Sequence, residues 1–136
     1  MNALTANSIK NLDKLHLPPS SRDAGEQLER MIHALITDYG AEKVIAFGSI
    51  VHGDVTEHSD IDLCIVRDHP PTCTHPSMDA GMILSKLKTT LSKDLLICTP
   101  RQMKEAEAAP FGVMEEVIHH GITLYERQST ESSGLA

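Results

Sequence analysis

Apolar positions along this chain follow the helical period in some stretches and form short continuous runs in others. The clearest helical pattern extends from Arg22 to Tyr39 and stops at Gly40, a residue type that commonly ends helices. Its apolar residues are Leu28, Met31, Ile32, Leu35 and Ile36. A second helix is predicted from about Met78 to Leu91, where Ile83, Leu84, Leu87 and Leu91 share one face. These two helices each have one face suited to covering a sheet.

Short apolar runs predict four strands, over residues 44–47, 61–66, 94–98 and 122–125. Between the last two strands, Thr99 is a predicted N-cap for a helix that begins at Pro100, and Gln102 completes a capping box. Pro110 interrupts this helix, and another is expected over residues 111–120, before Gly121. The strands therefore alternate with helices through the second half of the chain.

The ends and one loop lie outside this alternation. A short helix is predicted from Ser8 to about Leu15, stopped by two prolines, and residues 67–77 form a proline-rich surface loop. The polar segment after Arg127 is expected to be disordered. The predicted organisation is an N-terminal extension (1–21), one domain (22–126) and a disordered tail (127–136).

The order of the elements predicts an α/β (α+β) protein with a mixed sheet covered by helices. A short connection between the first two strands favours an antiparallel pair, and the helical crossover before residue 94 favours a parallel pair. At 136 residues the chain is long enough for one domain with a real core.

Composition and charge narrow the classes of function. The apolar runs are too short for a membrane span and the N-terminus lacks a signal-peptide pattern, so the cytoplasm is the expected location. The formal net charge is −7, and few aromatic residues are available for stacking on bases. Direct nucleic-acid binding is therefore disfavoured. A small nucleotide with its own metal ions, or a basic protein surface, fits this charge better.

The cysteines carry no motif. Cys64 and Cys98 fall in predicted strands, where a free thiol behaves as a small hydrophobic side chain. Cys73 stands near His75 in the proline-rich loop, but no pair of residues has the spacing of zinc ligands. The eight histidines are scattered, and most are expected at the surface.

The chemistry is concentrated in the stretch GSIVHGDVTEHSDID, residues 48–62. Gly48 and Ser49 follow a strand, and such a turn can direct backbone N–H groups and a hydroxyl at a phosphate. Asp60 and Asp62, spaced i and i+2 on a strand, point to one face and offer oxygen ligands for Mg²⁺. The alternative interpretation is a plain turn followed by solvated loop carboxylates, as is expected for the nearby Asp54.

A third carboxylate, Asp94, begins a strand that the preceding helix can return to the side of Asp60 and Asp62. Three carboxylates at one place repel one another, and bound Mg²⁺ removes that conflict. Two ions would then clamp the attacking and leaving oxygens of a phosphoryl transfer. The alternative for Asp94 is a solvated acid beside Lys93.

The pattern GS-x10-D-x-D followed by a strand-borne Asp resembles the DNA polymerase β-like nucleotidyltransferases. Within this superfamily the chain is similar to the minimal, MntA-type nucleotidyltransferases, over residues 26–126. The resemblance implies the palm-type fold, binding of the ATP triphosphate by Gly48 and Ser49, and two Mg²⁺ ions held by Asp60, Asp62 and Asp94 as catalytic acids. It also implies an antitoxin that adenylylates or contacts an all-helical HEPN toxin partner.

One departure from the family pattern bears on activity. Members commonly have Gly-Ser-Arg-x-Arg-Gly, whereas this chain has Ile50 and His52 at the arginine positions. His52 carries a full charge only below a pKa near 6.5, so it neutralises phosphate less than arginine does. Either His52 still contributes to nucleotide binding or it is an ordinary surface residue.

Three functions remain open from the sequence. The first is transfer of AMP from ATP to a hydroxyl acceptor, with the helical partner as the acceptor. The second, favoured by the missing arginines, is a catalytically weak protein that neutralises its partner by contact. The third is a small-molecule nucleotidyltransferase of the aminoglycoside-resistance kind, for which the chain is short, so that an acceptor pocket would have to come from a partner or a second copy of the chain.

Overall fold

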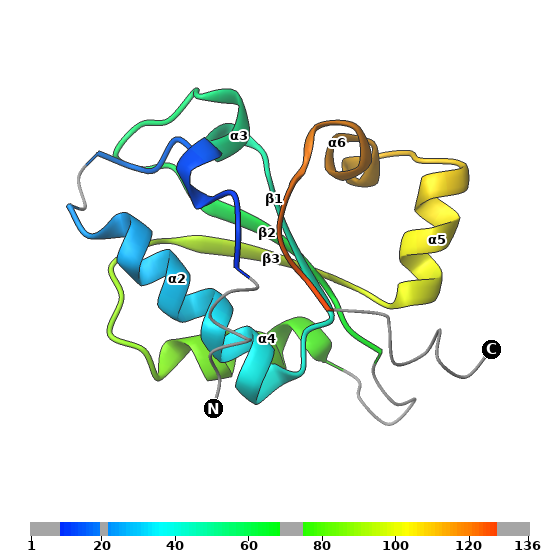
Figure 1. Ribbon diagram of the computed structural model, residues 1–136, viewed down its shortest axis with the longest axis horizontal. Helices are drawn as coiled ribbons and strands as arrows, with labels where there is room; N and C mark the ends of the chain where they lie inside the picture. The colour runs from blue at the N-terminus through cyan, green and yellow to red at the C-terminus, as the bar shows by residue number, and fades with distance from the viewer. Residues whose placement is uncertain (1–8, 20–21, 69–74, 128–136) are drawn as a thin grey trace.

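The computed structural model describes residues 9–19, 22–68 and 75–127. In chain order the elements are η1 (Leu12–Lys14), α2 (Ala24–Ala34), η2 (Leu35–Tyr39), β1 (Lys43–Phe47), α3 (Ser49–His52), β2 (Ile61–Val66), α4 (Pro76–Ser85), β3 (Lys93–Cys98), α5 (Pro100–Ala108), α6 (Val113–His120) and β4 (Ile122–Glu126). Figure 1 shows α2 and α4 on one side of the sheet and α5 and α6 on the other. The predicted α/β class with a helix-covered sheet is confirmed.

The sheet is four-stranded and mixed, with the order β3-β2-β1-β4. Strand β1 is antiparallel to both β2 and β4, and β2 is parallel to β3. Both pairings predicted from the connections are therefore correct. The register places Asp62 opposite Phe47 on one side and opposite Asp94 on the other, which brings the two acidic strands together at one end.

Residues of β1, β2 and β3 alternate between two hydrophobic clusters, one on each face of the sheet. The larger cluster holds Ile61, Leu63 and Ile65 of β2 against buried residues of α2 and α4 such as Leu28 and Leu84. The smaller cluster packs the intervening strand residues against Met103 of α5 and Val117 of α6. These strand residues are Ile45, Phe47, Cys64, Val66 and Cys98. Because side chains alternate along a strand, Asp60 and Asp62 belong to the same face as Cys64.

Two predicted helices differ from the observed ones at their ends. The helix expected over 22–39 is α2, and its last turn is the π-helical η2, which ends at Gly40 with φ of +83°. The helix expected over 78–91 begins at Pro76 instead, because proline suits the first helical position. It ends at Ser85, whose hydroxyl donates to the Met82 carbonyl and so competes with the helical pattern. Leu91 is still buried, but from the loop that precedes β3.

The prediction of a helix from Ser8 to Leu15 is wrong in the described part, where only the single 3₁₀ turn η1 forms. Ser8 itself lies outside the described residues. Lys10 N–H donates to the Leu124 carbonyl, and the Asn11 side chain donates to the Thr123 carbonyl. These bonds tie the segment to β4, so tertiary contacts replace the local helix. Asn11 adopts a left-handed conformation there, with φ of 65°.

The capping box predicted at the start of α5 is present. The Thr99 hydroxyl accepts from Gln102 N–H at 3.0 Å, and the Gln102 side chain accepts from Thr99 N–H at 2.9 Å. We expect Thr99→Ala to lower the free energy of unfolding by about 1 kcal/mol. Thermal or urea denaturation measures this loss, and Thr99→Ser, which keeps the hydroxyl, is the control. Equal stability of the two variants would show that the cap contributes nothing.

In the part of the chain that the structure describes, no helix combines the length and apolar character required to cross a membrane.

Candidate active site

The three carboxylates singled out from the sequence lie on neighbouring strands. Asp62 is the second residue of β2 and Asp94 the second residue of β3, and the two are partners in the parallel register. Asp60 comes just before β2 and, spaced i and i+2 from Asp62, belongs to the same face. The strand register therefore places Asp60, Asp62 and Asp94 at the same end of β2 and β3, on the face that α5 and α6 cover further along the strands.

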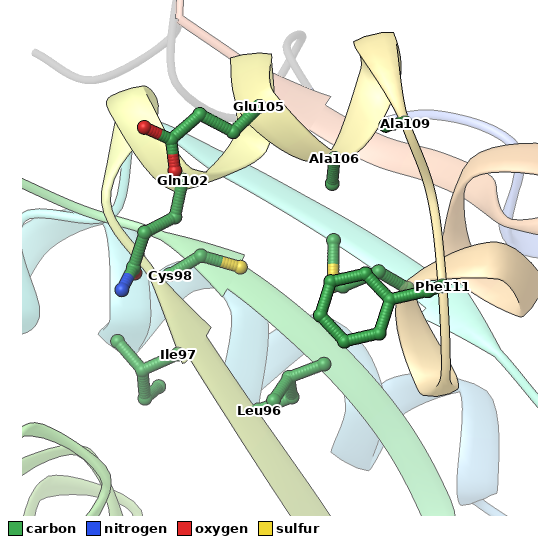
Figure 2. A pocket seen from close by; sticks show the side chains of 9 residues that line it. Leu96, Ile97, Cys98, Gln102, Glu105, Ala106, Ala109 and Phe111 are labelled. Carbon is green, nitrogen blue, oxygen red and sulfur yellow. The ribbon is translucent and has the colours of Figure 1, made fainter.

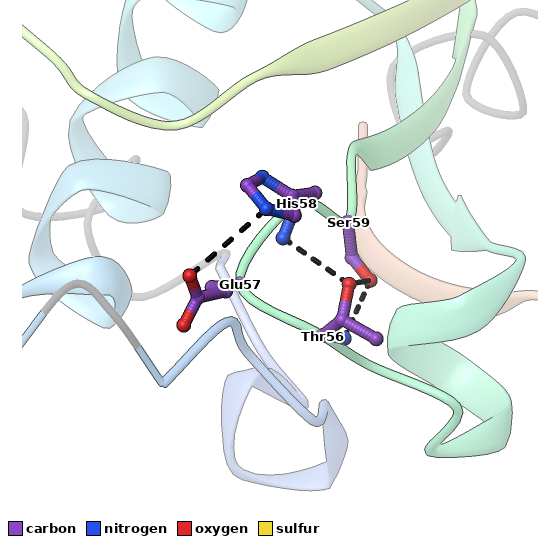
Figure 3. A network of polar contacts seen from close by, with 4 residues as sticks. All are labelled: Thr56, Glu57, His58 and Ser59. Carbon is purple, nitrogen blue, oxygen red and sulfur yellow. Dashed lines mark hydrogen bonds and ion pairs between the residues drawn. The ribbon is translucent and has the colours of Figure 1, made fainter.

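Asp60 follows a loop that makes hydrogen bonds within itself. The Ser59 hydroxyl accepts from Thr56 N–H at 2.8 Å, and the Thr56 hydroxyl accepts from His58 N–H at 3.1 Å (Figure 3). The Thr56 carbonyl also accepts from Ser59 N–H. These bonds turn the chain immediately before β2. Polar residues of the loop therefore fix where Asp60 enters the site.

Gly48 forms the turn between β1 and α3 and touches the acidic cluster directly. Its backbone has φ of 81° and ψ of −147°, a region that side-chain-bearing residues rarely adopt. A Cβ atom placed on Gly48 would collide with the Oδ2 atom of Asp62. Glycine is therefore required both by the backbone conformation and by the carboxylate beside it. Ser49 follows as the first residue of α3, half-buried, so the turn and the metal-ligating candidates form one site.

The electrostatics of Asp62 show that the carboxylates influence one another. Burial, followed by the negative charges of Asp94 and Asp60, raises the pKa of Asp62 above its ordinary value. Asp62 is half-buried, whereas Asp60 and Asp94 are exposed. A cation would relieve this repulsion, and carboxylate oxygens are the ligands that Mg²⁺ prefers. The donor set therefore fits a magnesium site in charge and in chemistry.

The three side chains are not already gathered around one point. Over residues 9–19, 22–68 and 75–127, no group of three His, Cys, Asp or Glu side chains is placed to hold a metal ion as it stands. The assignment of Asp60, Asp62 and Asp94 as metal ligands stays a prediction.

His52, the third predicted nucleotide-binding residue, lies at the end of α3 and pairs with a residue that the sequence did not point to. Its Nε2 atom is 2.6 Å from Oε2 of Glu116, on α6. The same oxygen accepts from Gly48 N–H at 3.3 Å. The His120 ring, also on α6, lies 5.3 Å from the His52 ring between centroids. The Glu116 carboxylate is therefore hydrogen-bonded to the turn that was expected to bind phosphate.

The charge state of Glu116 reflects these contacts. Burial acts to raise its pKa, but the hydrogen bonds from His52 and Gly48 and the charges of His52 and His120 outweigh it and lower the pKa of Glu116. The carboxylate is therefore ionised at neutral pH. From the sequence, Glu116 is one acid among several on a surface helix. The sequence indicated that the helix over residues 111–120 precedes a strand. It did not indicate that this strand lies beside β1, which is what brings Glu116 to the Gly48 turn.

A cavity of about 320 Å³ opens between β3 and the two helices α5 and α6. Figure 2 shows Leu96, Ile97 and Cys98 of β3 at its base and Phe111 at its side. Leu96 is two residues beyond Asp94 on the same strand face. Phe111 is 81% exposed, so the cavity has an apolar rim open to solvent. An apolar surface therefore lies next to the acidic end of β3.

The two buried cysteines behave as packing residues, as predicted. The Sγ atoms of Cys64 and Cys98 are 3.4 Å apart, both thiols are free, and both belong to the cluster under α5 and α6. The hydrogen bond between them, with burial, raises the pKa of Cys64, so this thiol is neutral at ordinary pH. Cys73 lies outside the described residues.

No match was found among the curated proteins. The family model described as polymerase beta, nucleotidyltransferase matches residues 29–130, which is well over half of the chain. The match contains the Gly48 turn and all three carboxylates. This chain belongs to the polymerase beta nucleotidyltransferase family.

Proposed function

We propose that this protein transfers AMP from ATP to a hydroxyl group, with Mg²⁺ bound by Asp60, Asp62 and Asp94. The observation that carries the proposal is the placement of three carboxylates at one end of β2 and β3, beside a glycine turn that tolerates no side chain. Family membership supports a nucleotidyltransferase activity. The choice of ATP, of AMP as the transferred group and of the acceptor goes beyond the family.

The donor nucleotide would bind at the turn between β1 and α3. Gly48 N–H and the Ser49 hydroxyl are donors for triphosphate oxygens, and His52, which shares the Glu116 acceptor with Gly48 N–H, is a group that can carry positive charge. Bound Mg²⁺ would supply the neutralisation of phosphate and carboxylate charge that the chain itself lacks. Asp62, which contacts the turn, links the donor subsite to the metal ligands.

The acceptor would approach from the side of Asp94, the more exposed of the two register partners. In the transfer, the acceptor oxygen forms a bond to the α-phosphorus, and the bond from that phosphorus to the bridging oxygen breaks. Pyrophosphate leaves with that oxygen, and the hydroxyl proton passes to a carboxylate of the site, for which Asp94 is placed best. The residues of the chain contribute mainly by positioning the groups and by electrostatics.

The acceptor that we propose is a hydroxyl side chain of a helical, HEPN-type toxin, which this chain would neutralise as an antitoxin. Phe111 lines the cavity and Val113 is the first residue of α6; both are exposed apolar residues and offer a surface for such a protein. The net charge of −7 also suits a basic protein surface better than a polynucleotide.

A second candidate is neutralisation of the same partner by contact alone. One observation favours it: Glu116 already accepts hydrogen bonds from Gly48 and His52, where the nucleotide would have to bind. Ile50, which is fully buried, cannot replace a phosphate-binding arginine. A protein with these features could keep the fold and the surface while transferring little.

The two candidates are separated by incubating the chain with Mg²⁺, ATP labelled at the α-phosphate, and a candidate helical partner protein of the HEPN type. We expect the label to appear on the partner and to disappear with Asp60→Ala. ATP labelled at the γ-phosphate is the control for phosphoryl transfer and should leave the partner unlabelled.

Each other outcome supports a different conclusion. If no label is transferred and the Asp60→Ala variant still neutralises the partner, the contact mechanism is correct. Transfer of the label to a small hydroxylated compound, with none on the protein, would instead support a small-molecule nucleotidyltransferase.

A further inference from the structure

Glu116 occupies the turn that the proposed function assigns to the triphosphate. We propose that its carboxylate is an internal competitor of the nucleotide, which holds the turn in the free protein and must be displaced before ATP binds. This inference rests on the proposed function, because it concerns the regulation of the same site. It adds a residue that is neither a metal ligand nor part of the Gly-Ser motif.

The competition follows from the identity of the donors. A single oxygen, Oε2 of Glu116, accepts from Gly48 N–H at 3.3 Å and from His52 Nε2 at 2.6 Å. A phosphate oxygen requires the same kind of donors, a backbone N–H group and a cationic side chain. An oxygen of the triphosphate and Oε2 of Glu116 cannot occupy the same position. Glu116 therefore provides, within the chain, the negative charge that the turn is built to accept.

The position of Glu116 on α6 allows this displacement without unfolding. The helix is anchored by the buried Val117, with Met114 and Ile118 packed against the same cluster. The side chain of Glu116 does not contribute to this packing and is 29% exposed, so it can rotate toward solvent while α6 stays in place. Its removal should therefore change ligand affinity much more than stability.

The surrounding charges make the competition unequal. Glu116 carries one negative charge, whereas a triphosphate carries several and brings Mg²⁺ with it. When Glu116 leaves, His52 becomes available to the ligand, and the His120 ring lies 5.3 Å away from it. In a chain without the two arginines common in this family, His52 is the side chain that shares the acceptor of Gly48 N–H at this turn. Glu116 therefore lowers nucleotide affinity without abolishing it.

The test measures the binding of Mg²⁺-ATP, and separately of inorganic tripolyphosphate, by isothermal titration calorimetry. Glu116→Gln keeps the size of the side chain and removes its charge. Glu115→Gln is the matched control, because it makes the same change in net charge one residue away on the exposed surface of α6. We expect Glu116→Gln to bind both ligands about three- to tenfold more tightly than wild type. Glu115→Gln should change affinity less than about twofold.

A readout without ligand tests the contact itself. A charge-assisted hydrogen bond shifts the resonance of its amide proton downfield. We therefore expect the Gly48 amide proton to move upfield in Glu116→Gln and to stay in place in Glu115→Gln. If the Gly48 resonance is the same in all three proteins, the carboxylate does not hold the turn in solution and the inference is wrong.

The binding results separate failure of this inference from failure of the proposed function. If wild type binds the ligands and Glu116→Gln binds them equally or more weakly, the inference is overturned and the proposed function stands. If none of the three proteins binds either ligand at millimolar concentration, the nucleotide function fails and the competition fails with it. If Glu116→Gln binds the ligands more tightly than wild type and Glu115→Gln does not, the result supports both the inference and the proposed function.

Discussion

Asp62→Asn is expected to lower nucleotidyl transfer about a thousandfold while making the folded protein more stable. The loss of activity follows because Asp62 is the carboxylate that touches both the Gly48 turn and the acidic end of β3. The gain in stability follows because the wild-type carboxylate is half-buried and close to two other negative charges. Since the side chain is partly solvated, we expect a gain of about 0.5–1 kcal/mol, or about 2–4 °C in Tm.

The pH dependence of this gain has a definite sign. The pKa of Asp62 is raised in the folded state, so ionisation of Asp62 destabilises the fold above that pKa. As the pH falls through the raised pKa, the wild-type side chain becomes neutral and the penalty disappears. The stability difference between Asp62→Asn and wild type should therefore be largest near neutral pH and shrink in acid.

Thermal denaturation at several pH values, with and without Mg²⁺, checks these expectations. Asp54→Asn makes the same change of charge in the loop before β2 and is the control. Mg²⁺ should raise the Tm of wild type and Asp54→Asn but not that of Asp62→Asn. A Tm for Asp62→Asn below that of wild type at neutral pH would show that the carboxylate stabilises the fold.

Gly48→Ala is expected to destabilise the protein by about 2–5 kcal/mol and to remove nucleotide binding. Two costs combine: alanine is strained at φ of 81° and ψ of −147°, and its Cβ collides with the Asp62 carboxylate. Either the turn or the carboxylate must move, and both moves disturb the donor subsite. Urea denaturation measures the stability, and calorimetry with Mg²⁺-ATP measures the binding.

Two controls divide the cost into its parts. Gly112 has nearly the same backbone conformation, with φ of 62° and ψ of −141°, and a Cβ there meets no atom within 4 Å. Gly112→Ala should therefore show the backbone cost alone, about 1–3 kcal/mol. Combining Gly48→Ala with Asp62→Ala should recover the rest, because the Asp62 Cβ would lie 3.5 Å from the new methyl group, an ordinary contact. If the stability effects of Gly48→Ala and Asp62→Ala are strictly additive in the double variant, the collision is refuted.

The sequence was sufficient where local rules decide the structure. Alternation along β2 predicted that Asp60 and Asp62 share a face, and the crossover through α4 predicted that Asp94 returns beside them. The capping box at Thr99 was visible because its two residues are three apart in the chain. Each of these features depends on neighbours in sequence or on the common right-handed connection.

The sequence was insufficient where distant segments meet. The segment before Leu15 has hydrogen-bonding partners on β4, more than a hundred residues away, and these override its helical pattern. Glu116 reaches the Gly48 turn because β4 pairs with β1 and brings α6 along. A single acid on a helix surface has no periodicity or spacing that indicates such a contact. The part of the site that α6 contributes was therefore found only in the structure.

The order of the strands separates the two halves of the proposed reaction. Gly48, which would receive the donor, follows the inner strand β1, whereas Asp94, which would face the acceptor, lies on β3 at the border of the sheet. A chain segment or a partner protein added along that edge of the sheet would alter which molecules reach Asp94 without contacting the nucleotide subsite. Selectivity for the two substrates can therefore diverge independently in chains of this design, with one donor retained while acceptors change.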